Sequence, residues 1–260
     1  MRRVTHRAWI ETASVLAPIW CVGCGADDVD LCDDCAEDLR QQTRRPFRAE
    51  GGALALPLVA AVGDQLEVLP AMAAAQYDGL VSRAVLGFKD HELIHLDRIL
   101  GPALHRAVHA LRRSLGAESG ASAVLLVAPP ASPAARVRRS HHPVEHLLRS
   151  TGLRPASGLM TVTAQSWLRA MLPGASHQKG HGMTSRRRRL AGTLRVTKAG
   201  EAMLAGAEVI MVDDVLTTGS TLHEMYVALS GAGARVLGAA VVAAAPKDGK
   251  DLGTRLGRGF

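Results

Sequence analysis

Residues 209–221 read VIMVDDVLTTGST, and this stretch indicates both the fold and a binding site. Four apolar residues predict a buried strand, the carboxylates Asp213 and Asp214 follow at its carboxyl end, and a turn of small residues leads into a helix. Ligands of open α/β sheets bind at that end of the strands. Backbone N–H groups and hydroxyls at a helix N-terminus favour an anion, so we expect a phosphate at Thr217–Thr221.

The acid pair suits a different part of such a ligand. Carboxylates repel a phosphate, so Asp213 and Asp214 are expected to hold the vicinal hydroxyls of a ribose, with a magnesium ion nearby. The alternative is a solvated strand end followed by Ser and Thr residues that only cap the next helix. The order of the whole stretch favours the binding site.

The surrounding pattern predicts an α/β fold. A helix over 221–229 and a strand over 236–244 follow the first strand, and an earlier strand over 124–127 precedes a helix through 146–148. Strand, helix and strand in this order indicate parallel pairing with right-handed crossovers. We therefore expect a parallel sheet flanked by helices.

Two further amphipathic helices are predicted before these elements, over 80–88 and 100–111, with Gly101-Pro102 marking a start or a kink in the second. A polar, basic stretch ends near residue 50 and is followed by two glycines. The predicted division is an N-terminal region, residues 1–50, with a helix, the cysteines and a linker, and a main domain, residues 51–260.

Composition restricts the possible functions. The formal net charge of +7 is compatible with anionic partners, but only 3% of residues are aromatic, which leaves little material for stacking nucleic-acid bases. No apolar run is long enough to cross a membrane, and the first twenty residues lack the apolar core of a secretory signal. We expect a cytoplasmic protein without a membrane partner.

All four cysteines fall within fifteen residues, as two C-x-x-C pairs. A reducing compartment disfavours disulfides, and paired C-x-x-C turns suit one tetrahedral zinc ion. With every position taken by protein, the zinc would be structural. Reduced structural cysteines or a redox pair are the alternatives. The predicted ligands are Cys21, Cys24, Cys32 and Cys35.

At this point the residues resemble a known family. The stretch at 209–221 is similar to the phosphoribosyl-diphosphate signature of type I phosphoribosyltransferases. The whole chain resembles the ComF family, with a four-cysteine knuckle, a Tyr77-Asp78-Gly79 entry to a helix that ends near Lys89, a strand before Pro130, an Arg-rich turn, and a stretch from Gln178 to Arg186 before the signature.

The resemblance implies a role for each part of the site. Asp213 and Asp214 would hold the ribose and act in catalysis. The 5′-phosphate would bind at Val215, Leu216, Thr217, Thr218, Gly219, Ser220 and Thr221, the diphosphate at Pro130, Arg136, Arg138 and Arg139, and a lid would carry Gln178 and Arg186. An exposed basic helix face remains the alternative for each of the three arginines after Pro130.

The chain also departs from the family pattern. Ser140 stands where many relatives have a glycine, which changes how closely the backbone can approach the diphosphate, and Arg189 stands where they have an asparagine. We interpret His141-His142 as polar surface groups rather than a second metal site. The acceptor pocket is expected in a hood formed by residues 60–89.

Three functions are compatible with these features. The first is a phosphoribosyltransferase that uses phosphoribosyl diphosphate and Mg²⁺ to modify a nucleobase or related acceptor. The second is a non-enzymatic adaptor in DNA uptake or processing that binds the same ligand and contacts single-stranded DNA through Arg186–Arg189. The third is a zinc-knuckle interaction module with the α/β domain as scaffold.

Overall fold

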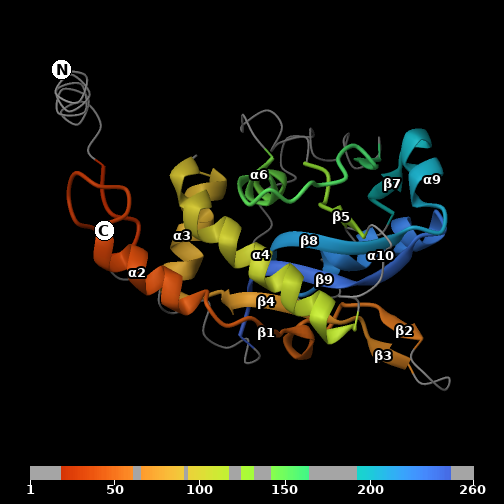
Figure 1. The fold of residues 1–260 in the computed structure, drawn as a ribbon, viewed down its shortest axis with the longest axis horizontal. Helices are drawn as coiled ribbons and strands as arrows, with labels where there is room; N and C mark the ends of the chain where they lie inside the picture. Colours follow the sequence, from red (N-terminus) through yellow and green to blue (C-terminus); the bar gives the residue numbers. More distant parts are fainter. Residues whose placement is uncertain are drawn as a thin grey trace, which may run out of the picture.

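The computed structural model describes residues 19–60, 66–90, 93–116, 124–131, 142–163 and 192–246. A five-stranded sheet runs through the centre of the molecule (Figure 1). Its strand order is β1 (Phe47–Arg48), β4 (Ala71–Gln76), β9 (Arg235–Ala244), β8 (Glu208–Leu216) and β5 (Leu125–Val127).

Pairing in this sheet is parallel from β4 through β9 and β8 to β5, and β1 is antiparallel to β4. The predicted parallel α/β sheet is therefore confirmed. The carboxyl ends of β8 and β5 lie at the same edge, because Leu126 is in register with Ile210 and Val127 with Met211. Whatever follows these two strands is brought together at that edge.

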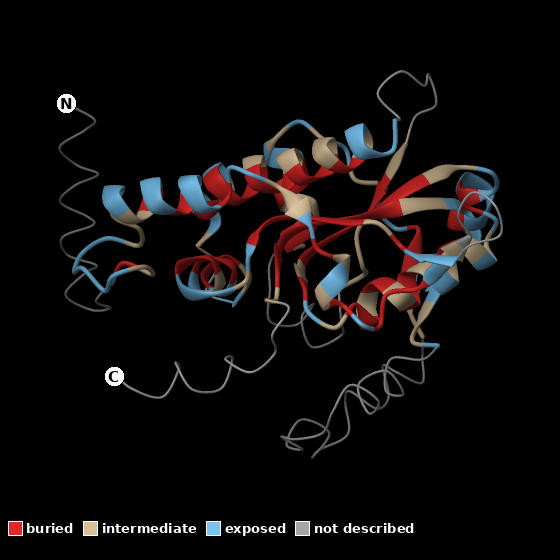
Figure 2. Ribbon diagram, turned by 90° about the horizontal axis from the view of Figure 1, so that it is seen from below, coloured by how far each residue is buried: buried red, intermediate tan, exposed pale blue. Residues whose placement is uncertain are grey.

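Helices cover both faces of the sheet. The first face carries α2 (Asp33–Gln42), α3 (Gly79–Asp90), α4 (Asp97–Ser114) and α6 (Pro143–Ser150). The second carries α10 (Ser220–Gly231) and α9 (Lys198–Leu204). In Figure 2 the strands between these layers are buried, and the outer sides of the helices are exposed.

Short strand pairs and 3-10 turns lie outside the central sheet. The hairpin β2–β3 (Leu58–Ala60 and Leu66–Val68) precedes β4, and the antiparallel pair β6–β7 (Met160–Val162 and Leu194–Val196) precedes α9. Short 3-10 turns lie at Glu50–Gly52 and Ile94–Leu96.

The central strand β8 is buried on both faces, as a parallel strand between two helical layers must be. Ile210 and Val212 pack into the core beneath α4, whereas Val209 and Met211 pack into the core beneath α10. This alternation follows from the two-residue period of a strand.

Two segments differ from the expectation. Gly101-Pro102 does not start a helix, because α4 begins at Asp97 and continues through both residues. The stretch expected to be a linker contains the end of α2 and the strand β1, and Leu39 of α2 is fully buried in the core beneath α4. The domain boundary near residue 50 stays a prediction.

The core beneath α4 should carry much of the stability. Leu104 is fully buried, whereas Leu115, just after the same helix, is 37% exposed. Leu104→Ala should lower the free energy of unfolding by about 2–5 kcal/mol, because it removes apolar contacts and leaves a cavity. Urea denaturation measures this. Leu115→Ala is the matched control and should cost less than about 1 kcal/mol; equal losses in both variants would contradict the packing described.

Candidate functional site

The signature forms a strand, a tight turn and a helix. Gly219 precedes the first residue of α10 with φ = 84°, a left-handed conformation that favours glycine. A Cβ at this position would also lie 3.0 Å from the backbone nitrogen of Leu56. The N–H of Ala55 donates to the carbonyl of Thr218 at 2.8 Å, so the segment around residues 53–56 supports the turn from behind.

Hydroxyls gather in this turn. Thr218 Oγ1 and Ser220 Oγ are 2.9 Å apart, and Thr217 is exposed. The first N–H groups of the twelve-residue α10 have no acceptor within the helix. The turn therefore combines backbone and hydroxyl donors with the positive end of a helix dipole, as an anion site requires.

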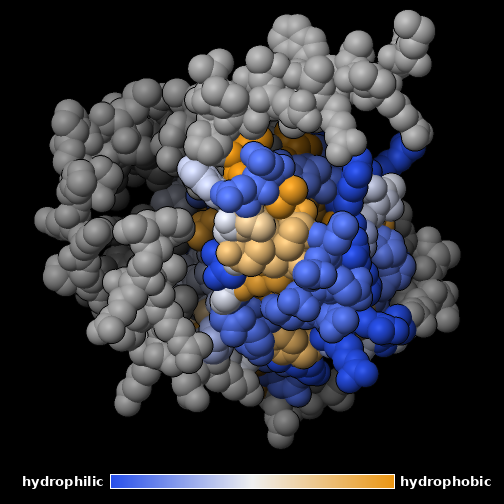
Figure 3. All heavy atoms as spheres, turned by 90° about the vertical axis from the view of Figure 1, so that its left-hand side faces the viewer, coloured by the Kyte–Doolittle hydropathy of each residue, from blue (hydrophilic) through white to orange (hydrophobic). Residues whose placement is uncertain are grey.

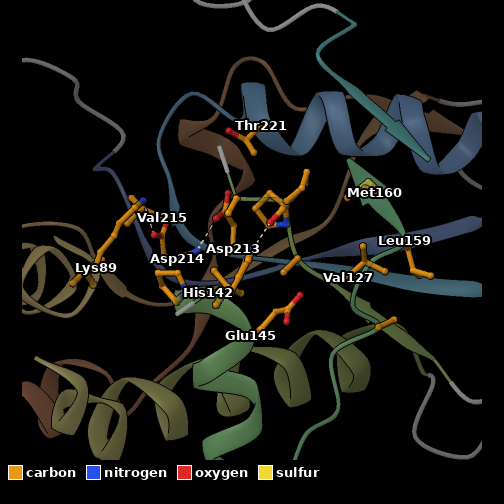
Figure 4. A pocket seen from close by; sticks show the side chains of 18 of the residues that line it. Lys89, Val127, His142, Glu145, Leu159, Met160, Asp213, Asp214, Val215 and Thr221 are labelled. Atoms are coloured by element: carbon orange, nitrogen blue, oxygen red, sulfur yellow. Dashed lines mark hydrogen bonds and ion pairs between the residues drawn. The ribbon is translucent and has the colours of Figure 1, made fainter. Parts of the chain in front are cut away.

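A cavity of about 760 Å³ opens at the carboxyl ends of β5 and β8 (Figure 4). It is lined from five directions: the end of β8 and the start of α10, the turn after β5, the first turn of α6, the segment that leads into β6, and α3 with Tyr77, two residues before it. The lining residues are Tyr77, Val85, Leu86, Lys89, Val127, Ala128, Pro129, Pro130, Ala131, His142, Pro143, Val144, Glu145, Ala156, Gly158, Leu159, Met160, Asp213, Asp214, Val215, Thr217 and Thr221.

The two carboxylates differ in environment. Burial, and next the charge of Asp214, raise the pKa of Asp213 to about 8. The N–H of Asp214 donates to Asp213 Oδ1 at 2.8 Å, which opposes this shift only in part. Asp214 Oδ2 lies 2.6 Å from the ammonium of Lys89, a residue in the last turn of α3. The site therefore holds one neutral acid and one ion pair near pH 7.

The first turn of α6 contributes polar groups that the sequence interpretation missed. His142 Nε2 is 2.8 Å from the carbonyl of Pro129, and this contact joins α6 to the turn after β5. The Nδ1 atom of His142 is buried and has no hydrogen-bond partner among the described residues. Glu145 also lines the cavity and accepts from Arg149 at 2.6 Å. His142 is thus part of the cavity wall rather than a surface group.

The structure brings some predicted site residues together and leaves others aside. Asp213, Asp214, Val215, Thr217, Thr221 and Pro130 all line the cavity. Leu216, Thr218, Gly219 and Ser220 build the turn behind it. The positions predicted for the diphosphate and the lid, namely Arg136, Arg138, Arg139, Gln178 and Arg186, lie outside the described residues. The ligand-binding roles stay predictions.

Four sulfur atoms converge on the opposite side of α3 from the cavity. The ligand atoms of Cys21, Cys24, Cys32 and Cys35 all lie within 4.8 Å of one another. The Sγ atoms of Cys21 and Cys24 are each 3.7 Å from that of Cys32. A zinc–sulfur distance of about 2.3 Å gives tetrahedron edges of about 3.8 Å, so these spacings fit a four-thiolate metal such as zinc.

The backbone also favours a thiolate at this cluster. Burial alone would raise the pKa of Cys21, but N–H groups of Cys24, Cys32 and Gly23 lower it to about 6. The N–H of Cys32 lies 3.3 Å from the Cys21 sulfur. The cluster is therefore a candidate metal centre separate from the cavity. Figure 3 views the molecule from this side and shows a hydrophobic area bordered by hydrophilic residues.

The comparison with protein families agrees with the geometry of the cavity. Residues 170–253 match the family model of the phosphoribosyl transferase domain. This match supports a type I phosphoribosyltransferase-like family. It includes β8, the turn and α10, and therefore the acid pair and the predicted phosphate site. No curated protein matches the chain.

Among the described residues, no helix has both the length and the apolar character needed to cross a membrane.

The cysteine cluster predicts one zinc ion per chain. Cys21→Ser should abolish stoichiometric zinc, because a tetrahedral site loses one of its four thiolates. Elemental analysis of the purified protein measures this. Asp34→Asn, an exposed neighbour in the same segment, is the control and should retain the metal. Wild-type protein that holds no zinc after purification with zinc supplied would contradict the site.

Asp213 predicts an unusual dependence of stability on pH. An unfolded aspartate loses its proton near pH 4, whereas Asp213 in the folded protein keeps it to about pH 8. Between these values the folded state binds more protons, so rising pH destabilises it through this group. Asp213→Asn removes the effect and should be more stable than wild type by at least about 1 kcal/mol at pH 8.5.

Urea denaturation at pH 5 and pH 8.5 tests this. The advantage of the Asn variant should grow between these two pH values. If the difference in unfolding free energy between the Asn variant and wild type stays constant, or if the variant becomes less stable than wild type as pH rises, Asp213 is ionised in the folded protein.

Proposed function

We propose that the cavity binds phosphoribosyl diphosphate and that the protein transfers its phosphoribosyl group to a nucleobase or related acceptor with Mg²⁺. One observation carries the proposal: Asp213, Asp214, Thr217 and Thr221, from β8 and the turn that follows it, line one cavity. A ligand that carries both vicinal hydroxyls and a phosphate could bind the acids and the turn at the same time.

Each part of the ligand has a chemically suited neighbour. The 5′-phosphate would accept from the N–H groups and hydroxyls at the start of α10. The ribose hydroxyls would donate to Asp213 and Asp214. The diphosphate would lie beside the turn after β5, at residues 128–131, where the first turn of α6 adds its helix dipole. The predicted arginines after this turn would balance its charge.

Magnesium fits the same end of the cavity. Carboxylate oxygens are the ligands that Mg²⁺ prefers; Asp214 supplies them, and Asp213 would do so once the ion displaces its proton. When bound, the ion would neutralise charge on the departing diphosphate. Lys89, which holds Asp214 at 2.6 Å, would have to share that carboxylate with the ion or with the ribose.

The transfer itself needs positioning more than a protein nucleophile. An acceptor nitrogen forms a bond to the anomeric carbon while the bond from that carbon to the diphosphate oxygen breaks, and the diphosphate leaves with its electron pair. Apolar side chains of Val127, Leu159 and Met160 line the cavity and would keep water from competing as the acceptor. Tyr77, Val85 and Leu86, from the predicted hood, would contact the acceptor.

We further propose that the chain is a ComF relative, on the strength of the cysteine cluster that precedes the phosphoribosyltransferase-type site. Ser140 in place of glycine favours the adaptor alternative, because a Cβ there restricts close approach of the diphosphate. In that case the protein binds the ligand without turnover and contacts single-stranded DNA through Arg186–Arg189. DNA binding that is absent, or that does not weaken with salt, would remove this alternative.

Isothermal titration with phosphoribosyl diphosphate and Mg²⁺ tests the primary proposal. Wild-type protein should bind, and Asp213→Asn combined with Asp214→Asn should weaken binding at least tenfold, or about 1.4 kcal/mol, because the charged acceptor at Asp214 and the ionisable carboxyl of Asp213 are both lost. Glu208→Gln is the control, since Glu208 lies at the far end of the same strand in an ion pair with Arg235. Absence of binding by the wild type would overturn the proposal.

Turnover separates the enzyme from the adaptor. Diphosphate release should appear with at least one member of a panel of nucleobases and should vanish in the double variant. Tight binding with no release across the panel would favour the adaptor.

A further inference from the structure

The helix α3 connects the cysteine cluster to the cavity. Its first half contacts the turn between Cys21 and Cys24, and its second half supplies Val85, Leu86 and Lys89 to the cavity wall. The two functional regions are therefore separated by one short helix (Figure 1). Lys89 lies six positions after Arg83, which is about 9 Å along the helix axis.

The contact with the cysteine turn is directional. The guanidinium of Arg83 donates from Nε to the carbonyl of Val22 at 2.9 Å and from Nη2 to that of Gly23 at 2.8 Å. Gly23 packs so closely that an added Cβ would lie 2.5 Å from Cys35 Sγ and 2.9 Å from Leu80 Cδ1. The turn that presents these carbonyls is thus shaped by the sulfur cluster and pressed against α3.

The cysteine turn meets α3 along one side. Leu80 lies against Gly23, Arg83 holds both carbonyls, and the Val22 side chain lies beside Gly87. Positions 80, 83 and 87 follow the spacing of one helical face. Apolar contacts such as that of Phe88 hold the helix in the core but are non-directional, whereas the paired hydrogen bonds fix its position along its own axis.

At the other end of α3, Lys89 makes a short ion pair. Its Nζ lies 2.6 Å from Asp214 Oδ2, and the side chain of Asp214 is only 11% exposed. The pair determines how the Asp214 carboxylate is presented to the cavity, and a displacement of α3 by about 1 Å would stretch it beyond hydrogen-bond range. The position of α3 therefore sets the geometry of one of the two acids.

We propose that Arg83 and the metal-loaded cysteine cluster are positioning elements of the ligand site, acting through α3 and Lys89 on Asp214. The inference rests on the proposed binding of phosphoribosyl diphosphate at this acid pair. Loss of the metal releases the four sulfurs, the Val22 and Gly23 carbonyls move, and Arg83 no longer fixes α3. The ligand then binds less tightly although no residue of the cavity has changed.

The central measurement is the affinity for phosphoribosyl diphosphate by isothermal titration in Mg²⁺ buffer. Arg83→Ala should weaken binding about fivefold or more, within the usual range of coupling between sites. Arg40→Ala is the matched control, because it removes one exposed arginine that pairs only with Glu37 among the described ion pairs, and it should change affinity less than twofold. Arg83→Lys keeps a single donor group and should give an intermediate value.

Combining the changes tests whether the cysteine cluster acts on Asp214 through Arg83 and Lys89, because changes along one path should not have additive effects on affinity. Removing zinc with a chelator that spares Mg²⁺ should weaken binding as much as Arg83→Ala does, and Arg83→Ala should add nothing in the zinc-free protein. It should likewise add nothing in a Lys89→Met background. Full additivity, or unchanged affinity in Arg83→Ala, would overturn the inference.

Hydrogen exchange gives a second readout that needs no ligand. Amides in the last turn of α3, residues 86–90, should lose protection in Arg83→Ala and in zinc-free wild type, but not in Arg40→Ala. If wild-type protein does not bind phosphoribosyl diphosphate, the proposed function fails and this measurement alone decides whether the cluster positions α3. Unchanged protection would then reject the coupling.

Discussion

Two adjacent carboxylates at the buried end of β8 are the constraint around which the cavity is arranged. Ile210 and Val212 of this strand face the layer of α3 and α4, and Val209 and Met211 face α10, but the alternation stops at the acid pair, because Val215 packs on the first layer and Leu216 on the second. Asp214 meets Lys89 of α3, whereas Asp213 accepts from the N–H of Asp214 and has a raised pKa. The groups that each acid meets thus assign a charged role to Asp214 and a neutral role to Asp213.

The surrounding core makes room for this arrangement. β4 and β9, which pair beside β8, are largely alanine at buried positions, including Ala73–Ala75 and Ala239–Ala240. Small side chains let α4 lie close to the sheet, and α6 packs on α4 in turn. This stacking carries the first turn of α6, with His142 and Glu145, to the edge where β5 and β8 end.

Sequence patterns predicted the parallel sheet, β8 with α10, and the convergence of the cysteines, because each depends on residues close together in the chain. The alanine-rich β4 was not predicted, since Ala71–Gln76 lacks the β-branched residues that mark a strand, and only its neighbours in the sheet make it one. The Lys89–Asp214 pair and the cavity role of His142 depend on tertiary contacts that no local pattern reveals.

The link between the cysteine cluster and the cavity follows from the size of the N-terminal segment. A few tens of residues cannot bury a core of their own, so the cysteine turn and α2 are expected to pack on the main domain. The side available to them is that of α3, and Leu31 and Cys35 accordingly pack against the core beneath α4. Because the same helix ends at Lys89, a metal that shapes the turn also supports the helix that reaches Asp214.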